Sequence, residues 1–380
     1  MSTTSPPTQP GPSTSHLSTN PRRDRAPGLR LALRRPRWWP SPAFRRFLAV
    51  RLSALVLLGV GITFVAFVLT HLVPGDPAAA NLGQRAIADP AAVAAFRAHY
   101  GLDKPLPQQY LIYVANLAHG DFGESQQSHR PVRDDLAEYV PATLELSSTA
   151  IAISLVFGIG LGVTAAMNRD RVVDQVLRVI TLAGVSMPTF WLALVALYIV
   201  FFKLGWAPSG GRLDPGQLPD GHVTGFYTID ALLAGDWPTF TSAVAHILLP
   251  ASVLALYTVS LLTRFTRASV LEVLGNDYIR AARAKGLPER IVIVRHILRA
   301  ALVPVITVAG VAFGSLLTGT VLVETIFAWP GIGQYAYRSA TNLDLPAIMG
   351  VSLFVAVVYI TVNFAVDLLY GIIDPRIRVG

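Results

Sequence analysis

The sequence predicts an all-α polytopic membrane protein with six transmembrane helices and an external helical insertion after the first of them. Two observations support this fold class. The 380 residues are 52% hydrophobic and only 14% charged, whereas a soluble globular protein has about 25% charged residues. Six uncharged apolar runs also approach or exceed the roughly 20 residues that a helix needs to cross a bilayer. These runs are Leu52–Leu72, Leu146–Asn168, Val179–Phe202, Ile247–Thr263, Ala300–Val323 and Leu345–Val366.

The charges of the segments between the runs predict the orientation in the lipid bilayer. Four alternate segments together hold 23 basic and seven acidic residues, and the three between them hold eight basic and 14 acidic residues. An excess of Lys and Arg marks the cytoplasmic side, so both termini are expected in the cytoplasm. The net charge of +8 therefore reflects orientation, and no nucleic-acid partner is expected. The basic set is 1–51, 168–178, 264–300 and 372–380; the acidic set is 73–141, 203–246 and 324–347.

The first two regions of the chain differ sharply in composition. Residues 1–43 are rich in Ser, Thr, Pro and Arg and are predicted to be a disordered, basic cytoplasmic extension. Residues 44–140 contain the first span and the external insertion. In the insertion, Leu106, Tyr110 and Tyr113 recur at helical spacing, which predicts an amphipathic helix. Two interpretations of this helix stay open: packing on the chain's own membrane part, and a platform for an external partner.

The remaining five spans are predicted to form one core at residues 141–371, followed by a cytoplasmic tail at 372–380. The second span contains Gly158, Gly160 and Gly162. Small residues at this spacing let transmembrane backbones approach each other, so they predict close helix packing. The segment between the fifth and sixth spans is amphipathic and is expected to be external.

The sequence offers no catalytic, cofactor or metal site. A Walker P-loop needs a Gly-Lys pair, and none of the three lysines follows a glycine. The histidines form no HExxH motif, and the absence of cysteine excludes thiolate metal ligands. Ion-driven transporters place ionisable residues inside the bilayer, but here Glu145 and His246 lie near the ends of spans. An ion-coupled secondary transporter and a membrane enzyme are therefore the weaker alternatives.

Residues 276–304, NDYIRAARAKGLPERIVIVRHILRAALVP, stand out as a charged, structured segment between the fourth and fifth spans. A short helix is predicted to end at Gly286, which suits a left-handed helix cap. After Pro288, a second helix is predicted to begin at Glu289 and to run directly into the fifth span. Such a connection would transmit force from the short helix to two spans, and a pathway without its own energy source needs a partner that supplies force.

Five blocks resemble those of ABC importer permeases of the dipeptide/oligopeptide type, and most closely the first of the two permease subunits. ARAKGLPERIVIVRHILRAALVP is similar to the EAA loop of these permeases, although Arg280 stands where the family-wide pattern has an acid. The resemblance covers roughly residues 44–375. The other blocks are FVLTHLVPGDPAAANLG, HYGLDKPLPQQYLIYVANLAHGDFGES, PATLELS and VETIFAWPGIGQ.

This resemblance implies a type I ABC importer permease fold in a bacterial inner membrane. It further implies a pathway shared with a paralogous permease, two cytoplasmic ATPase domains or subunits, and an external substrate-binding protein. The permease itself would work by alternating access and would hydrolyse no ATP. Dipeptide, oligopeptide, nickel and glutathione importers share the architecture, so the cargo stays open.

Three groups of candidate site residues follow. The loop that couples to the ATPase would comprise Arg280, Ala281, Ala282, Arg283, Ala284, Lys285 and Gly286. Polar groups in the third and fifth spans could line a pathway, with interhelical hydrogen bonding as the alternative; they are Ser186, Thr189, Ser315, Thr318 and Thr320. The platform for a binding protein would include Asp121, Glu124 and Trp329.

Overall fold

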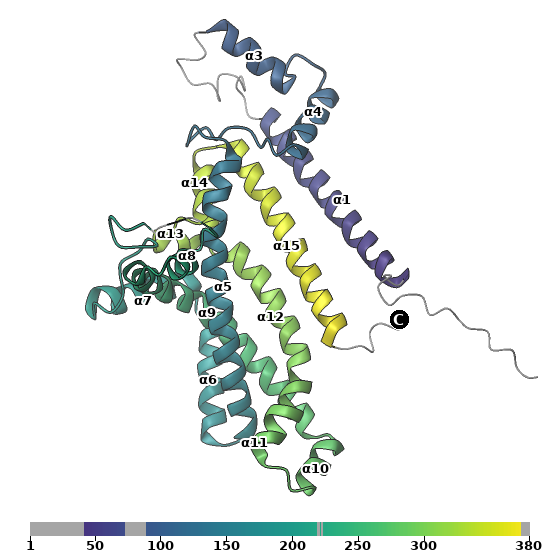
Figure 1. The fold of residues 1–380 in the computed structure, drawn as a ribbon, viewed down its shortest axis with the longest axis vertical. Coiled ribbons are helices and arrows are strands. Elements are labelled where there is room, and N and C mark those ends of the chain that lie inside the picture. Colours follow the sequence, from purple (N-terminus) through teal and green to yellow (C-terminus); the bar gives the residue numbers. More distant parts are fainter. Residues whose placement is uncertain (1–41, 73–88, 219–220, 222, 374–380) are drawn as a thin grey trace, which may run out of the picture. The chain divides into compact units, whose positions relative to one another are not determined.

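A computed structural model describes residues 42–72, 89–218, 221 and 223–373, which fold as helices joined by turns (Figure 1). The described part contains no β-strand, only an isolated bridge between Glu124 and Pro131. The predicted extension at 1–43 and tail at 372–380 lie almost wholly outside the described residues. The long helices are α1 (Pro42–Leu72), α5 (Val132–Met167), α9 (Trp237–Leu274), α12 (Arg299–Gly319) and α15 (Leu345–Ile373). The shorter ones are α3 (Pro90–Tyr100), α4 (Leu106–Ala118), α6 (Val172–Ser186), α7 (Thr189–Ala196), η1 (Leu197–Lys203), α8 (Tyr227–Ala234), α10 (Asp277–Ala284), α11 (Glu289–Ile291), η2 (Val292–Leu298), α13 (Val321–Ile326) and α14 (Ile332–Thr341).

Four helical stretches are long and apolar enough to cross a membrane, and they coincide with the second, fourth, fifth and sixth predicted spans. They are Val132–Met167, Trp237–Leu274, Glu289–Leu317 and Leu345–Val362. Pro250 does not end the fourth, because α9 continues through it for 38 residues. The first predicted span lies within α1, where Leu52–Val65 form a shorter apolar helical stretch.

The third predicted span, Val179–Phe202, is wrong as a single straight helix. The chain bends by 104° between α6 and the following α7–η1 segment. Met187 at the bend has an extended backbone (φ −80°, ψ 128°). Pro188 explains this geometry, because the proline ring disfavours a helical conformation in the preceding residue and proline has no N–H to continue the helix.

Close packing of α5 on α9 forms the centre of the fold, as the glycines of α5 predict. A Cβ atom added at Gly158 would lie 2.6 Å from the Leu262 Cβ, and one at Gly162 would lie 2.5 Å from the Thr266 Cβ. Gly160 points to open space. Two of the three glycines therefore allow the helices to touch, and the apolar core continues from this contact. Its members include Leu146, Ala150, Ile247, Leu254, Val323, Phe327 and Trp329.

Separate apolar clusters cover the two ends of α5. At its C-terminal end, Ala166 packs with residues of α9, α10, η2 and α12. At its N-terminal end, Val132 and Leu136 pack with Ile332 and Tyr335 of α14 and with α15. The segment 276–304 and helix α14 consequently lie at opposite ends of α5 (Figure 1).

The predicted amphipathic helix of the insertion is confirmed as α4. Its tyrosines contact the chain's own long helices. The Tyr110 hydroxyl lies 3.1 Å from the Thr63 Oγ1 of α1, and its ring meets Phe67 edge-on. The Tyr113 hydroxyl lies 3.3 Å from the Met349 sulfur of α15. Internal packing therefore accounts for this face of α4.

Candidate functional site

The short helix predicted in the segment 276–304 is α10, and one side of it is buried in the chain's own core. Asn276 precedes the helix in an extended conformation. Ile279 is fully buried and Ala282 is 7% exposed. Both belong to the cluster that joins the ends of α5 and α9 to η2 and α12. This packing fixes α10 against the ends of three long helices.

Gly286 ends the helix as predicted. Its φ of +74° lies in the left-handed region that favours glycine. The Gly286 N–H donates to the Arg283 carbonyl at 2.9 Å, and the Leu287 N–H reaches the Ala282 carbonyl at 3.5 Å. These two bonds are the pattern of a Schellman motif. Pro288 follows, and α11 begins at Glu289.

An ion pair spans this turn. The Arg283 Nη2 lies 2.6 Å from the Glu289 Oε1, and the Arg283 Nε lies 3.2 Å from Oε2. Both side chains are nearly half exposed, so the pair contributes at most about 1 kcal/mol. Its bidentate geometry nevertheless links α10 directly to the helix that enters the fifth span.

The helix after the turn buries only part of the apolar face that its sequence predicts, namely Ile291, Val294 and Ile297/Leu298. Ile291 and Val294 are 43% and 59% exposed, whereas Ile297, together with Val292, is fully buried. The cause is η2, a π-helical stretch over Val292–Leu298. A π-turn adds a residue to the helical repeat, so side chains five apart reach the same face. The predicted continuity with the fifth span is confirmed.

Six of the seven candidate coupling residues lie on the exposed side of the turn, and Ala282 does not. The burial of Ala282 against α5 and η2 removes it from any surface that could dock a partner. The six exposed candidates are small or basic residues, which suits close approach by another protein. The exposed residues are Arg280, Ala281, Arg283, Ala284, Lys285 and Gly286.

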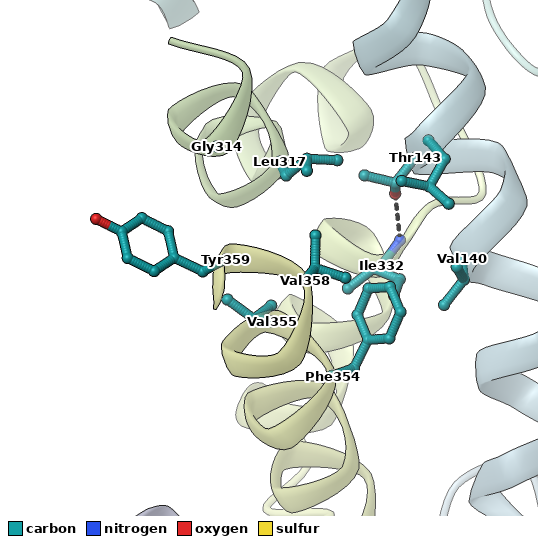
Figure 2. Close-up of a pocket in the computed structure, with 10 residues that line it drawn as sticks. Val140, Thr143, Gly314, Leu317, Ile332, Phe354, Val355, Val358 and Tyr359 are labelled. Atoms are coloured by element: carbon teal, nitrogen blue, oxygen red, sulfur yellow. Dashed lines mark hydrogen bonds between the residues drawn. The ribbon is translucent and has the colours of Figure 1, made fainter. Parts of the chain in front are cut away.

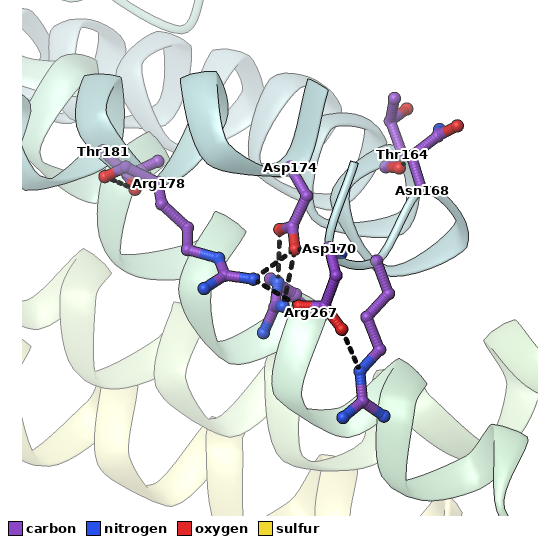
Figure 3. A network of polar contacts seen from close by, with 8 residues as sticks. Thr164, Asn168, Asp170, Asp174, Arg178, Thr181 and Arg267 are labelled. Atoms are coloured by element: carbon purple, nitrogen blue, oxygen red, sulfur yellow. Dashed lines mark hydrogen bonds and ion pairs between the residues drawn. The ribbon is translucent and has the colours of Figure 1, made fainter. Parts of the chain in front are cut away.

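A buried carboxylate ties α6 to α9 near the same end of the fold, and no sequence motif predicted it. Asp174 is fully buried and accepts two hydrogen bonds from Arg267, at 2.7 and 2.8 Å, and one from Arg178 (Figure 3). Arg178 also contacts Asp170 in the turn between α5 and α6. Because 93 residues separate Asp174 from Arg267, spacing could not have predicted the pair.

The candidate pathway residues do not form one surface. Ser186 and Thr189 flank the bend between α6 and α7, and the Ser186 hydroxyl bonds to the Leu182 carbonyl of its own helix. The Ser315 hydroxyl similarly bonds to the Val311 carbonyl. Thr320 is fully buried, and the side chain of Thr318 lies outside the described part of the chain.

The candidate platform is partly corrected. Trp329 is 1% exposed, and its Nε1 donates to the Ala142 carbonyl at 2.9 Å, so it belongs to the core and to no exposed surface. Glu124 is exposed, and Asp121 is partly buried and accepts from the Gly123 N–H. Trp329 was misassigned because the amphipathic pattern of the segment between the fifth and sixth spans does not show which part of that segment is buried in the core.

A second buried ion pair anchors the loop before α8 to α5. The Arg212 Nη2 lies 2.6 Å from the Glu145 Oε2, and both side chains are at most 6% exposed. Thr228 donates to the other carboxylate oxygen through its N–H and hydroxyl. Glu145 is thus a satisfied structural group, which agrees with its predicted place near the end of a span. The pairing of Arg212 with Glu145 was not predicted, because no motif in the loop before α8 distinguishes this arginine.

These contacts make α10 a rigid, exposed connector between α9 and α12. The helix is packed on its inner side, capped at its C-terminus and bridged to α11, while its outer side is open to a partner. The described residues contain no group of three or more His, Cys, Asp or Glu side chains placed to hold a metal ion. Because α10 is packed, capped and bridged in this way, it is suited to transmitting movement between α9 and α12.

Comparison with known proteins is consistent with this geometry. A family model described as "Binding-protein-dependent transport system inner membrane component" matches residues 158–379, and a model of the N-terminal part of such components matches residues 44–147. The probable D,D-dipeptide transport system permease protein DdpB of Escherichia coli is 44% identical over 89% of this chain and 98% of its own length. The di/tripeptide transport system permease protein DppB of Pseudomonas aeruginosa is 46% identical over 87% of this chain and 98% of its own length.

One solved structure, the inward-facing methionine ABC transporter MetNI, aligns with a TM-score of 0.48 and 16% identity over 63% of this chain and 96% of that chain. The family models cover most of the described helices, including α10 and its turn. The chain therefore belongs to the family of binding-protein-dependent transport system inner membrane components.

Proposed function

We propose that this chain is a permease subunit of an ATP-driven importer of dipeptides or oligopeptides. It would form the translocation pathway together with a paralogous permease and would work by alternating access. The names of relatives that are 44% and 46% identical to it support a peptide cargo. Nickel and glutathione are the alternative cargoes within the same group of importers.

The rigid connection from α10 through the Gly286 turn to α12 is the observation that carries this proposal. A cytoplasmic ATPase would dock on the exposed side of α10, around Ala281 and Ala284. Because α10 is packed against α9 and η2, a displacement of the ATPase would move the ends of both spans together. The ATPase partners would hydrolyse the ATP, and this chain would contribute no catalytic residue.

The orientation is part of the proposal, with both termini and α10 in the cytoplasm and the α4–α5 turn outside. Natural cysteines are absent, so single cysteines at Glu124 and Lys285, both exposed, provide a clean test. An impermeant thiol reagent added to intact spheroplasts should label Glu124→Cys only. Labelling of Lys285→Cys from outside would contradict the proposed orientation.

Uptake into proteoliposomes tests the function itself. The complete transporter should accumulate a radiolabelled dipeptide only under two conditions. ATP must be present on the side of the membrane where the ATPases dock on α10, and the binding protein must be present on the opposite side. A protonophore should leave uptake unchanged, because no proton gradient is used. Uptake that collapses with the protonophore and persists without ATP would instead identify an ion-coupled transporter. Competition by nickel or glutathione, with none by dipeptides, would identify the alternative cargo.

A further inference from the structure

A carboxylate is buried without a cation at the end of α5 opposite α10. Glu324 of α13 is fully buried. Its Oε1 accepts a hydrogen bond from the Thr143 hydroxyl of α5 at 2.7 Å, and its Oε2 accepts from the Gln334 backbone N–H of α14 at 2.9 Å. None of the ion pairs found in the described part of the chain includes it. A buried carboxylate held only by neutral donors needs all of them, because each lost bond leaves a buried polar group unsatisfied.

Two glycines leave the space that this carboxylate occupies. A Cβ atom at Gly331 would lie 2.5 Å from both the Glu324 Oε1 and the Thr143 Oγ1. One at Gly333 would lie 2.9 Å from the Glu324 Oε2 and 2.8 Å from the Val321 Cα. Neither glycine has a positive φ, so space around the carboxylate, and not backbone conformation, explains them.

The same groups hold the first turn of α14 on α5. The Thr143 hydroxyl donates to Glu324. It also accepts from the Ile332 N–H at 2.8 Å, the bond drawn in Figure 2. The carboxylate accepts from Gln334 two residues further along. N–H groups in the first turn of a helix have no partner within the helix, and a negative charge there is favoured by the helix dipole. Glu324 and Thr143 together satisfy this end of α14.

Helix α14 in turn presents an exposed surface. Its inner side packs through Ile332 and Tyr335, whereas Tyr337 is 51% exposed and Leu343, just after the helix, is 63% exposed. The neighbouring turn is tied to the end of the same helix, because the Ser125 hydroxyl donates to a carboxylate oxygen of Asp344. The direction of α14 therefore sets where this whole surface lies.

We propose that Glu324 is a positioning residue: it fixes the first turn of α14 and so orients the exposed surface that the external binding protein contacts. This inference rests on the proposed function, since it assumes an importer with a binding protein. Glu324 itself contacts no partner and acts only through α14.

ATPase activity of the reconstituted transporter, titrated with its binding protein, tests the inference. Glu324→Gln places an amide donor against the backbone N–H groups, and Thr143→Val removes the bridging hydroxyl. Each should raise the binding-protein concentration for half-maximal stimulation by roughly tenfold, the effect of one unsatisfied buried group, and leave basal ATPase activity unchanged. Thr143→Ser, which keeps the hydroxyl, and Thr325→Val, on the exposed side of α13, should behave as wild type.

The double variant Glu324→Gln/Thr143→Val should be worse than either single variant, because the first change removes the bond from the Gln334 N–H and the second removes the bond from the Ile332 N–H. Unchanged half-saturation in both single variants would overturn the inference. Loss of basal activity in both would also overturn it, because Glu324 and Thr143 would then support the whole fold and not the orientation of α14. Failure of the proposed function is distinguishable, since wild-type transporter would then show no ATP-dependent dipeptide uptake.

Discussion

Replacing Gly286 with valine should weaken the attachment of the ATPase while the chain still folds and inserts. The φ of +74° is the reason, since nothing lies within 4 Å of an added Cβ atom and no side-chain clash arises. A non-glycine residue in this region costs about 1–3 kcal/mol, and a β-branched residue lies at the upper end. Reduced freedom of the unfolded chain offsets about 0.4–1 kcal/mol. The net cost of about 1–2 kcal/mol corresponds to a factor of roughly 5–30 in the population of the correct turn.

The assay is co-purification of the ATPase with each variant, followed by titration of the ATPase onto the purified permease. Gly286→Asn is the matched control, because asparagine tolerates the left-handed conformation. The valine variant should bind the ATPase roughly 5–30-fold more weakly, and the asparagine variant should bind nearly as well as wild type. Equal binding by all three proteins would refute the role of the turn in docking.

Three further outcomes are expected. Gly162→Val should lower stability in detergent by about 1–3 kcal/mol through overpacking against α9, whereas Gly160→Val, which points to open space, should leave thermal unfolding nearly unchanged; equal effects would contradict the packing described. Arg212→Met should cost about 3–5 kcal/mol in denaturant unfolding, because it leaves the buried Glu145 carboxylate without its cation; a loss below 1 kcal/mol would show that solvent reaches the site. Burial raises the pKa of Glu324 above its ordinary value of 4.5, and hydrogen bonds from Thr143 and Gln334 offset only part of this rise. The folded chain therefore binds this proton more tightly than the unfolded chain does, so the contribution of Glu324 to stability is present below pH 4.5 and declines as pH rises through the raised pKa. Glu324→Gln should remove this decline from the pH dependence of the free energy of unfolding.

Four of the six predicted spans and the Gly286 turn could be predicted because each depends on residues close together in the sequence. Hydrophobic length predicted the four helices of membrane length, and Gly286 with Pro288 predicted where α10 ends. The third span was predicted as one run, Val179–Phe202, although Pro188 lies within it. A proline shows where a helix is interrupted, whereas the 104° angle depends on what each half packs against.

The polar contacts could not be predicted, because they join residues far apart in the sequence. Thr143 and Glu324 are separated by 181 positions and meet only when α5 and α13 pack. The inward position of Ala282 was missed for a related reason. In the sequence, Ala282 cannot be told apart from the exposed alanines beside it. Only the structure shows that this side of α10 packs against the apolar cluster at the ends of α5 and α9. The π-helical register of η2 likewise has no simple sequence signal.

Site-specific cross-linking at Ala281 tests most directly whether α10 is where the chain receives its driving force. The chain has no cysteine, so Ala281→Cys can hold one photoreactive maleimide on the exposed side of α10 without disturbing the buried Ala282. Leu218→Cys, in the exposed loop before α8, is the control. In the active transporter we expect the ATPase to be cross-linked from position 281 and not from 218, with a yield that changes when ATP is bound. An active transporter that shows no adduct with the ATPase from position 281, with or without ATP, would contradict the coupling role of α10.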